Sequence, residues 1–196
     1  MSTGIILLIV AFVIIFWAAG IYNNLVRLKN QVKNAWGQID VQLQRRYDLI
    51  PNLVETVKGY MTYEKETLEA IVDARSRAMN ARETLKSQDM PTGDAMKELM
   101  SAETVLKNTL PQIFALSENY PQLRASENMA QLQEELRTTE NQVAFARQSY
   151  NDQVMSYNTA QEQFPAVMVA KMLGHSPAEL YKVEEESAKK AVNVSF

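Results

Sequence analysis

The first 26 residues of this chain carry no charged side chain, and this stretch constrains the fold more than any other part of the sequence. Gly4 to Tyr22 reads GIILLIVAFVIIFWAAGIY. At about 1.5 Å per residue, a helix of this length crosses the hydrocarbon core of a bilayer, which is about 30 Å thick. A secretory signal would begin with a basic region, which this stretch lacks, although Ala18-Ala19-Gly20 resembles a cleavage site. We therefore expect residues 1–23 to form a transmembrane anchor.

Three basic residues follow this segment and predict its orientation. Arg27, Lys29 and Lys33 come directly after the apolar stretch, and Lys and Arg are retained on the cytoplasmic side of a span. We expect a single-pass protein of the inner membrane, with its N-terminus outside and its C-terminal domain in the cytoplasm. The same three residues either contact anionic lipid headgroups or only enforce this topology.

The rest of the sequence lacks the motifs of known chemistry. It has no cysteine, which excludes disulfides, thiolate metal sites and a cysteine nucleophile, and its single histidine, His175, reads as a solvated loop residue. The residues after Arg46 are acidic on balance, which argues against nucleic acid as a partner. We expect no cofactor, no metal and no enzymatic activity.

Apolar residues recur at spacings of three and four along nearly the whole body, which predicts an all-α fold. The first stripe continues from the span through about residues 24–60. At Pro51 the helix either kinks or gives way to a new helix with Asp48 as its N-cap, and the unbroken phase of the stripe favours the kink. Further helices are predicted between the break at 59–63 and the turn at 87–94, over about 94–119, and over about 126–163. Together they form a long antiparallel bundle over residues 24–165 that continues the transmembrane helix.

Helix lengths set the predicted layout. If successive helices alternate in direction, Asn24 lies opposite Phe164, and Val32 lies opposite Val154 to within one turn. Residues 166–196 then form a membrane-proximal C-terminal segment and tail, in which only Val192 to Phe196 has a strand pattern. The segment Phe164 to Leu173 either lies in the membrane interface, with Lys171 reaching the headgroups, or packs as bundle core.

The segment Ile39 to Tyr60, IDVQLQRRYDLIPNLVETVKGY, resembles the LemA family. Tyr120-Pro121, Tyr150-Asn151, Tyr157-Asn158 and Phe164-Pro165 fit the same pattern. The resemblance implies a single-span bacterial protein with a long-helix bundle and no agreed enzymatic activity. It also implies links to membrane stress, to a membrane metalloprotease and, in one branch, to magnetosome membranes. It supplies no catalytic residues.

Polar residues beside the helical seams have two readings. We expect ion pairs that fix the register of the helices, and the alternative is a contact surface for a partner. For Tyr150-Asn151 and Tyr157-Asn158, hydrogen-bonded seam positions explain the seven-residue repeat more simply than a ligand site does. The charged seam residues are Asp40, Arg45, Glu55, Arg75, Glu118, Glu140 and Arg147.

Small residues mark one face of the predicted span. Gly4, Ala11 and Ala18 recur every seven residues, and close approach over small side chains favours association of helices in lipid. We therefore predict a homo-oligomer in the lipid bilayer, acting as a scaffold for membrane shape or envelope integrity. The alternative is an adaptor or sensor that presents its bundle to a membrane protease or a signalling partner.

Overall fold

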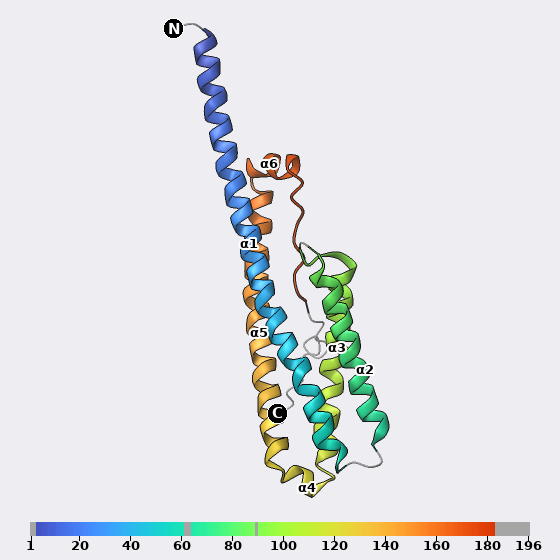
Figure 1. Ribbon diagram of the computed structural model, residues 1–196. Coiled ribbons are helices and arrows are strands. Elements are labelled where there is room, and N and C mark those ends of the chain that lie inside the picture. The colour runs from blue at the N-terminus through green and yellow to red at the C-terminus, as the bar shows by residue number, and fades with distance from the viewer. Residues whose placement is uncertain (1–2, 61–63, 89, 183–196) are drawn as a thin grey trace, which may run out of the picture. The chain divides into compact units, whose positions relative to one another are not determined.

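The computed structural model describes residues 3–60, 64–88 and 90–182. Within these ranges the regular secondary structure is entirely helical, which confirms the predicted all-α class. The helices are α1 (Thr3–Lys58), α2 (Lys65–Lys86), α3 (Gly93–Ser117), α4 (Pro121–Arg124), α5 (Glu127–Glu162) and α6 (Ala166–Met172) (Figure 1). The strand pattern at Val192 to Phe196 lies outside the described residues.

The chain forms two compact units, whose boundaries fall inside α1 and α5. The first, here called the hairpin unit, takes the described residues of Met1–Gln42 and Gln142–Leu180. The second, the bundle unit, takes those of Leu43–Asn141 and Tyr181–Phe196. Helix α1 runs without a break through residues 23 and 24. The predicted boundary between anchor and bundle would therefore be a change from lipid to water along one helix, and it stays a prediction.

In the hairpin unit α1 and α5 run antiparallel. The rings of Trp36 and Tyr150 lie 5.6 Å apart in an edge-on arrangement, and Gln42 and Gln142 line the same groove. Residue numbers therefore fall along α5 as they rise along α1. This confirms the predicted pairing of these two segments and places them in the register that sets Val32 against Val154. Both valines are fully buried.

The bundle unit is built from the last turns of α1, from α2, α3 and α4, and from the first turns of α5. Its core positions recur at three and four residues, as a helix with one buried face requires. Val72 is exposed, because Ile71 takes the buried position on the face that it shares with Leu68 and Ala78. The main core residues are Leu43, Ile50, Leu53, Val57, Leu68, Ile71, Leu85, Met96, Leu99, Leu106 and Ile113.

Helix α1 continues through Pro51, as the phase of the apolar stripe predicts. Proline has no N–H, so the carbonyl of Tyr47, four residues earlier, loses its helical donor. Arg75 on α2 supplies a substitute, because its Nε donates to that oxygen at 2.7 Å. Arg75, one of the predicted seam charges, thus replaces a missing backbone hydrogen bond, whereas the sequence predicted that it would form an ion pair.

Candidate functional site

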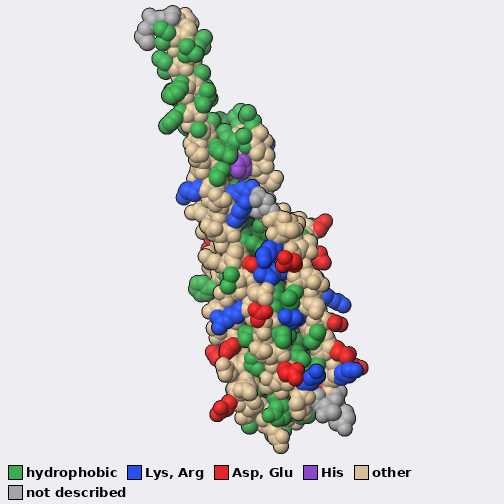
Figure 2. All heavy atoms as spheres, viewed as in Figure 1, with side chains coloured by type: hydrophobic (Ala, Val, Ile, Leu, Met, Phe, Trp, Pro, Cys, Tyr) green, Lys and Arg blue, Asp and Glu red, His purple; other side chains and the backbone are tan. Residues whose placement is uncertain are grey.

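The first turns of α1 expose apolar side chains around the whole helix. In the part of the chain that the structure describes, this is the one helix long and apolar enough to cross a membrane. Figure 1 shows it standing clear of α5 and α6, and Figure 2 shows hydrophobic side chains over its surface. An apolar surface of this extent requires a cover, so the segment is a candidate membrane span.

The three residues predicted to meet lipid headgroups follow this segment in α1. Arg27 is exposed, and its guanidinium donates to Asn24 Oδ1 at 2.8 Å. Lys29 and Lys33 are half-buried. Since Asp40 is the first acidic residue of the chain, the end of the apolar segment is electropositive. The contact of these residues with headgroups stays a prediction.

The predicted packing strip of the span lies open. Gly4 and Ala11 are exposed and Ala18 is half-buried. A Cβ added to Gly4 would have no heavy atom within 4 Å, so a neighbouring helix could approach closely there. The strip is sterically available, and its use as a contact remains a prediction.

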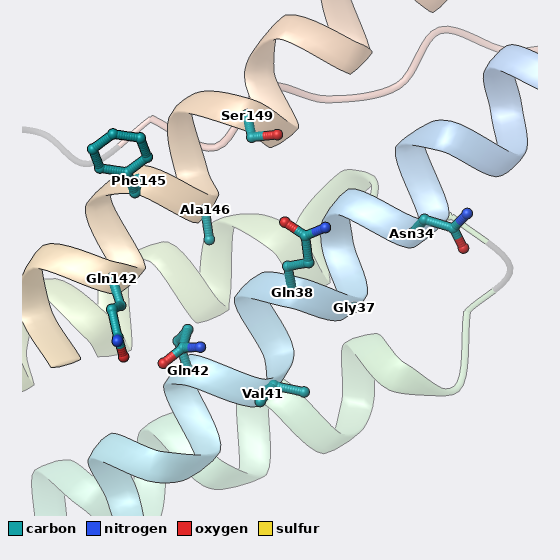
Figure 3. A pocket seen from close by; sticks show the side chains of 9 residues that line it. All are labelled: Asn34, Gly37, Gln38, Val41, Gln42, Gln142, Phe145, Ala146 and Ser149. Carbon is teal, nitrogen blue, oxygen red and sulfur yellow. The ribbon is translucent and has the colours of Figure 1, made fainter.

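An open groove lies between α1 and α5 within the hairpin unit (Figure 3). Its volume is about 820 Å³. Sequence reasoning missed it, although two apolar residues off the core stripe, Val41 and Phe145, mark its edges. They are 61% and 80% exposed. The groove is lined by Asn34, Gly37, Gln38, Val41, Gln42, Gln142, Phe145, Ala146 and Ser149.

The chemistry of this groove suits another helix better than a reaction. Gly37 and Ala146 contribute little side chain, so a partner's backbone can come near. The other lining groups are amides and one hydroxyl, which form hydrogen bonds but do not titrate in the physiological range. The side-chain oxygen of Gln42 is buried and has no hydrogen-bond partner among the described residues. A buried acceptor without a hydrogen bond costs free energy, so this oxygen favours a hydrogen-bond donor from a second molecule.

Neutral side chains of α5 hold the segment that follows α6. Tyr150 Oη donates to the carbonyl of Glu179 at 2.9 Å. Asn158 makes two bonds to the backbone of Ala178, accepting from its N–H at 2.9 Å and donating to its carbonyl at 2.9 Å. These contacts confirm that Tyr150 and Asn158 are hydrogen-bonded seam residues.

His175 lies in the loop after α6, as predicted, but it is half-buried and contacts two tyrosines rather than being fully solvated. Its Nδ1 lies 3.0 Å from Tyr157 Oη, and its ring centroid lies 6.4 Å from that of Tyr22 on α1. Burial lowers the pKa of His175 below its ordinary value, and the nearby positive charge of Lys29 lowers it further. The neutral ring therefore predominates and can accept the tyrosine hydrogen bond.

The bundle unit buries a cluster of charges. Arg46 and Glu103 are both buried, and Arg46 Nη1 donates to Glu103 Oε2 at 2.6 Å. Arg46 also donates to Glu140, and Tyr47 Oη donates to Glu103. Lys107 Nζ lies 3.9 Å from Glu140 Oε1. The cluster thus ties α1, α3 and α5 together within this unit.

The environment of this cluster is structural in character. Burial raises the pKa of Glu103, while the Arg46 charge and the Tyr47 hydrogen bond oppose the increase. Burial also raises the pKa of Tyr47, and the neighbouring Glu103 charge adds to the increase. Among the described residues there is no group of three or more His, Cys, Asp or Glu that could hold a metal ion. The arrangement fits the register role predicted for seam charges.

Of the seam charges predicted from the sequence, Glu140 belongs to this cluster, whereas its buried arginine and buried glutamate were not among them. Arg45, predicted at the seam, is exposed, and Arg46 is the buried arginine. Glu55 and Glu118 are also exposed, whereas Asp40, Glu140 and Arg147 are half-buried. The missed signal was periodicity, because Glu103 follows Leu99 by four residues and precedes Leu106 by three.

Comparison with known families shows to which family this chain belongs. A profile of the LemA family matches residues 35–196, most of the chain. The chain belongs to the LemA family. This confirms the resemblance drawn from the segment Ile39 to Tyr60.

Three relatives place this LemA-family chain among named proteins. The protein LemA of Metamycoplasma hominis is 27% identical over 170 residues, which cover 87% of this chain and 73% of that protein. The magnetosome protein MamQ of Magnetospirillum gryphiswaldense is 24% identical over 174 residues, which cover 82% of this chain and 64% of that protein. The magnetosome protein MamQ 2 of Paramagnetospirillum magneticum is 22% identical over 180 residues, which also cover 82% of this chain and 64% of that protein. This chain therefore spans 64% of the length of these magnetosome proteins.

The LemA match begins after the candidate span and after Lys33. It covers the groove apart from Asn34, the hydrogen-bonded segment and the charge cluster, so family membership rests on the helical body. The family match and the exposed apolar helix together support a membrane-associated helical protein.

Proposed function

We propose that this chain is a non-enzymatic, single-span membrane scaffold that self-associates through its helices and contributes to membrane shape or envelope integrity. The groove between α1 and α5 carries the proposal, because it exposes Val41 and Phe145 beside small residues on the helix that also bears the apolar segment. The similarity to proteins named for the magnetosome supports a role in membrane architecture.

A second copy of the chain fits the groove well. Phe145 of one copy can enter the groove of another, where Gly37 leaves room for an aromatic ring. The unpaired oxygen of Gln42 and the neighbouring amides can then bond polar groups of the second copy. Aromatic anchors seated in small-residue pockets are the usual centres of binding energy at interfaces.

The span offers a parallel contact. Gly4, Ala11 and Ala18 lie on one face of α1, and in lipid such small-residue faces favour close helix packing. Because α1 is continuous, neighbouring copies would share one direction. The excess of Lys and Arg after the span favours an N-terminus outside and a body in the cytoplasm, which protease protection in spheroplasts tests.

The second candidate function is that of an adaptor for a membrane protease or a signalling partner. It is favoured by another groove, in the bundle unit, where Val72 is exposed. That groove has a volume of about 540 Å³, and its mixed charges suit a peptide segment. It is lined by Val54, Lys58, Lys65, Leu68, Glu69, Val72 and Asp73.

Self-association is tested by measuring the mass of the full chain in detergent and in nanodiscs. We expect a defined homo-oligomer whose dissociation constant rises at least about tenfold, or about 1.4 kcal/mol, in Phe145→Ser. Met155→Ser is the matched control, because Met155 is also on α5 in the hairpin unit and is 60% exposed, but it does not line the groove. Replacing Ala11 and Ala18 together with Leu should weaken the assembly further.

Two results would contradict the scaffold. A wild-type chain that stays monomeric at every concentration removes self-association altogether and favours the adaptor. An oligomer that Phe145→Ser and Met155→Ser affect equally shows that the groove is not the contact.

A further inference from the structure

Helix α6 and the residues that flank it expose large apolar side chains. Phe164, Met168 and Met172 are 81%, 60% and 86% exposed, and Leu173 is also exposed. Met168 and Met172 are four residues apart and so lie on one face of α6. Ala170, on the other face, is buried. The segment therefore has one buried face, at Ala170, and one exposed apolar face that has no partner among the described residues. The core packing considered from the sequence occurs at Ala170 but not at the exposed apolar residues.

The end of α6 is fixed beside the base of the apolar segment of α1. Gly174 turns the chain with a φ of +70°, a conformation that favours glycine, and the N–H of His175 donates to the carbonyl of Ala170 at 3.0 Å. His175 then contacts the ring of Tyr22. Figure 1 shows α6 lying across the end of α5, next to α1.

Aromatic residues of α1 mark this level as the edge of a bilayer. Trp17 and Tyr22 are both exposed and close the apolar segment. Tryptophan and tyrosine are enriched where the hydrocarbon core meets the headgroups. Because His175 contacts Tyr22, the residues just before it lie at the same level as this aromatic boundary.

The charges around α6 match an anionic lipid surface. No acidic residue occurs between Gln163 and Ala178, and Lys171 is exposed in the last turn of α6. The Lys29 charge lies close enough to His175 to lower the pKa of that ring. An apolar face with basic residues at its edge is the pattern of a helix that lies in the membrane interface.

We propose that α6, together with Phe164 and Leu173, is a membrane foot, a second attachment of the chain that lies in the interface of the bilayer which α1 crosses. Phe164, Met168, Met172 and Leu173 enter the boundary between headgroups and acyl chains, and Lys171 meets lipid phosphates. The seven residues of α6 are too few to span, so the foot lies flat. The inference rests on the anchoring part of the proposed function.

The tether makes a weak foot effective. A short apolar segment alone binds membranes marginally, but α1 holds this one at the surface, so its insertion is an intramolecular event. The chain then meets the bilayer at two places, the span and the foot. Two attachments restrict the tilt of the hairpin unit, which one flexible anchor would not do.

Spin labelling of the full chain in proteoliposomes tests the foot, and the parent has no cysteine to remove. Met168→Cys carries the nitroxide, and its accessibility to oxygen and to a water-soluble nickel chelate is measured. Met155→Cys is the matched control, because Met155 is likewise 60% exposed in the hairpin unit but lies on α5. We expect an oxygen-to-nickel ratio several-fold higher at Met168 than at Met155, and higher still in phosphatidylglycerol than in phosphatidylcholine.

A third label separates the failure of the foot from the failure of the anchor. Val13→Cys lies within the candidate span and should favour oxygen. If Val13 favours oxygen while Met168 matches Met155, the foot is overturned and the anchor stands. If Val13 is itself open to the nickel chelate, the anchoring function fails. Spin broadening at Met168 that disappears on dilution with unlabelled chain would show a second copy on this face and would also overturn the foot.

Discussion

In the hairpin unit neutral side chains of α5 fasten the segment after α6, whereas the bundle unit buries a charged cluster. Tyr150 and Asn158 bind the backbone of the segment after α6, and each bond lies near 2.9 Å. Arg46 and Glu103 instead bind each other between α1 and α3. Neutral bonds fasten an irregular segment to a helix, and the ionic cluster sets helices in register.

This difference has an energetic consequence. Truncating a neutral partner leaves a buried backbone group unpaired, at a cost of about 1–3 kcal/mol. Removing one member of a buried ion pair leaves an uncompensated charge, at a cost of about 3–5 kcal/mol. Replacing both charges can be nearly neutral, because the desolvation of the ions is then also removed. The two units should therefore respond differently to single and to paired substitutions.

The largest effect is expected at Arg46. Arg46→Met leaves Glu103 buried without its counter-charge and should lower the free energy of unfolding by about 3–5 kcal/mol. The measurement is urea unfolding of the full chain in detergent, followed by circular dichroism. Arg45→Met is the matched control, since Arg45 is exposed, and should change stability by less than about 0.5 kcal/mol.

A paired substitution sharpens this result. Arg46→Met combined with Glu103→Gln removes both charges and leaves an amide oxygen to accept from Tyr47. The double variant should be more stable than Arg46→Met alone. A double variant as unstable as the single one would mean that lost packing of the Arg46 side chain, rather than an unpaired charge, dominates.

The sequence predicted the regular parts of both units better than their polar interiors. Apolar periodicity located the long helices and their continuity through Pro51, because repetition averages over single errors. The lengths of those helices then predicted the antiparallel register around Val32. It misjudged single charges. A one-residue choice between Arg45 and Arg46 depends on a rotation of about 100°, within the width of the apolar face.

Residues after α6 were the hardest to predict. The chain from Gly174 to Leu180 has no periodicity, so nothing in the sequence showed that His175 packs against Tyr22 or that Ala178 pairs with Asn158. The groove was missed for a similar reason, since it depends on where side chains of two helices stop short of each other. Such features arise from three-dimensional packing rather than from local pattern.

The second effect tests the neutral side of the comparison. Asn158→Leu leaves the N–H and the carbonyl of Ala178 unpaired and should cost about 1–3 kcal/mol, less than Arg46→Met. Hydrogen exchange should rise in residues 175–182. Asn158→Asp keeps the acceptor but loses the donor, so its effect should be intermediate. Asn141→Ala, at an exposed position of α5, is the control. A loss larger than that of Arg46→Met would invert the comparison.

The smallest effect is the dependence of stability on pH, and the contributions from the two units should change in opposite directions. The pKa of His175 is lowered from 6.5, so just below this pH the unfolded chain binds more protons and stability falls as the pH falls. The pKa of Glu103 is raised from 4.5, so its contribution to stability falls as the pH rises through the raised value.

His175 is the single histidine, and an NMR titration should give a pKa below 6.5. Lys29→Gln should bring that value closer to 6.5, whereas Lys33→Gln should leave it unchanged, and a wild-type pKa at or above 6.5 would show that the ring is not held neutral by its surroundings.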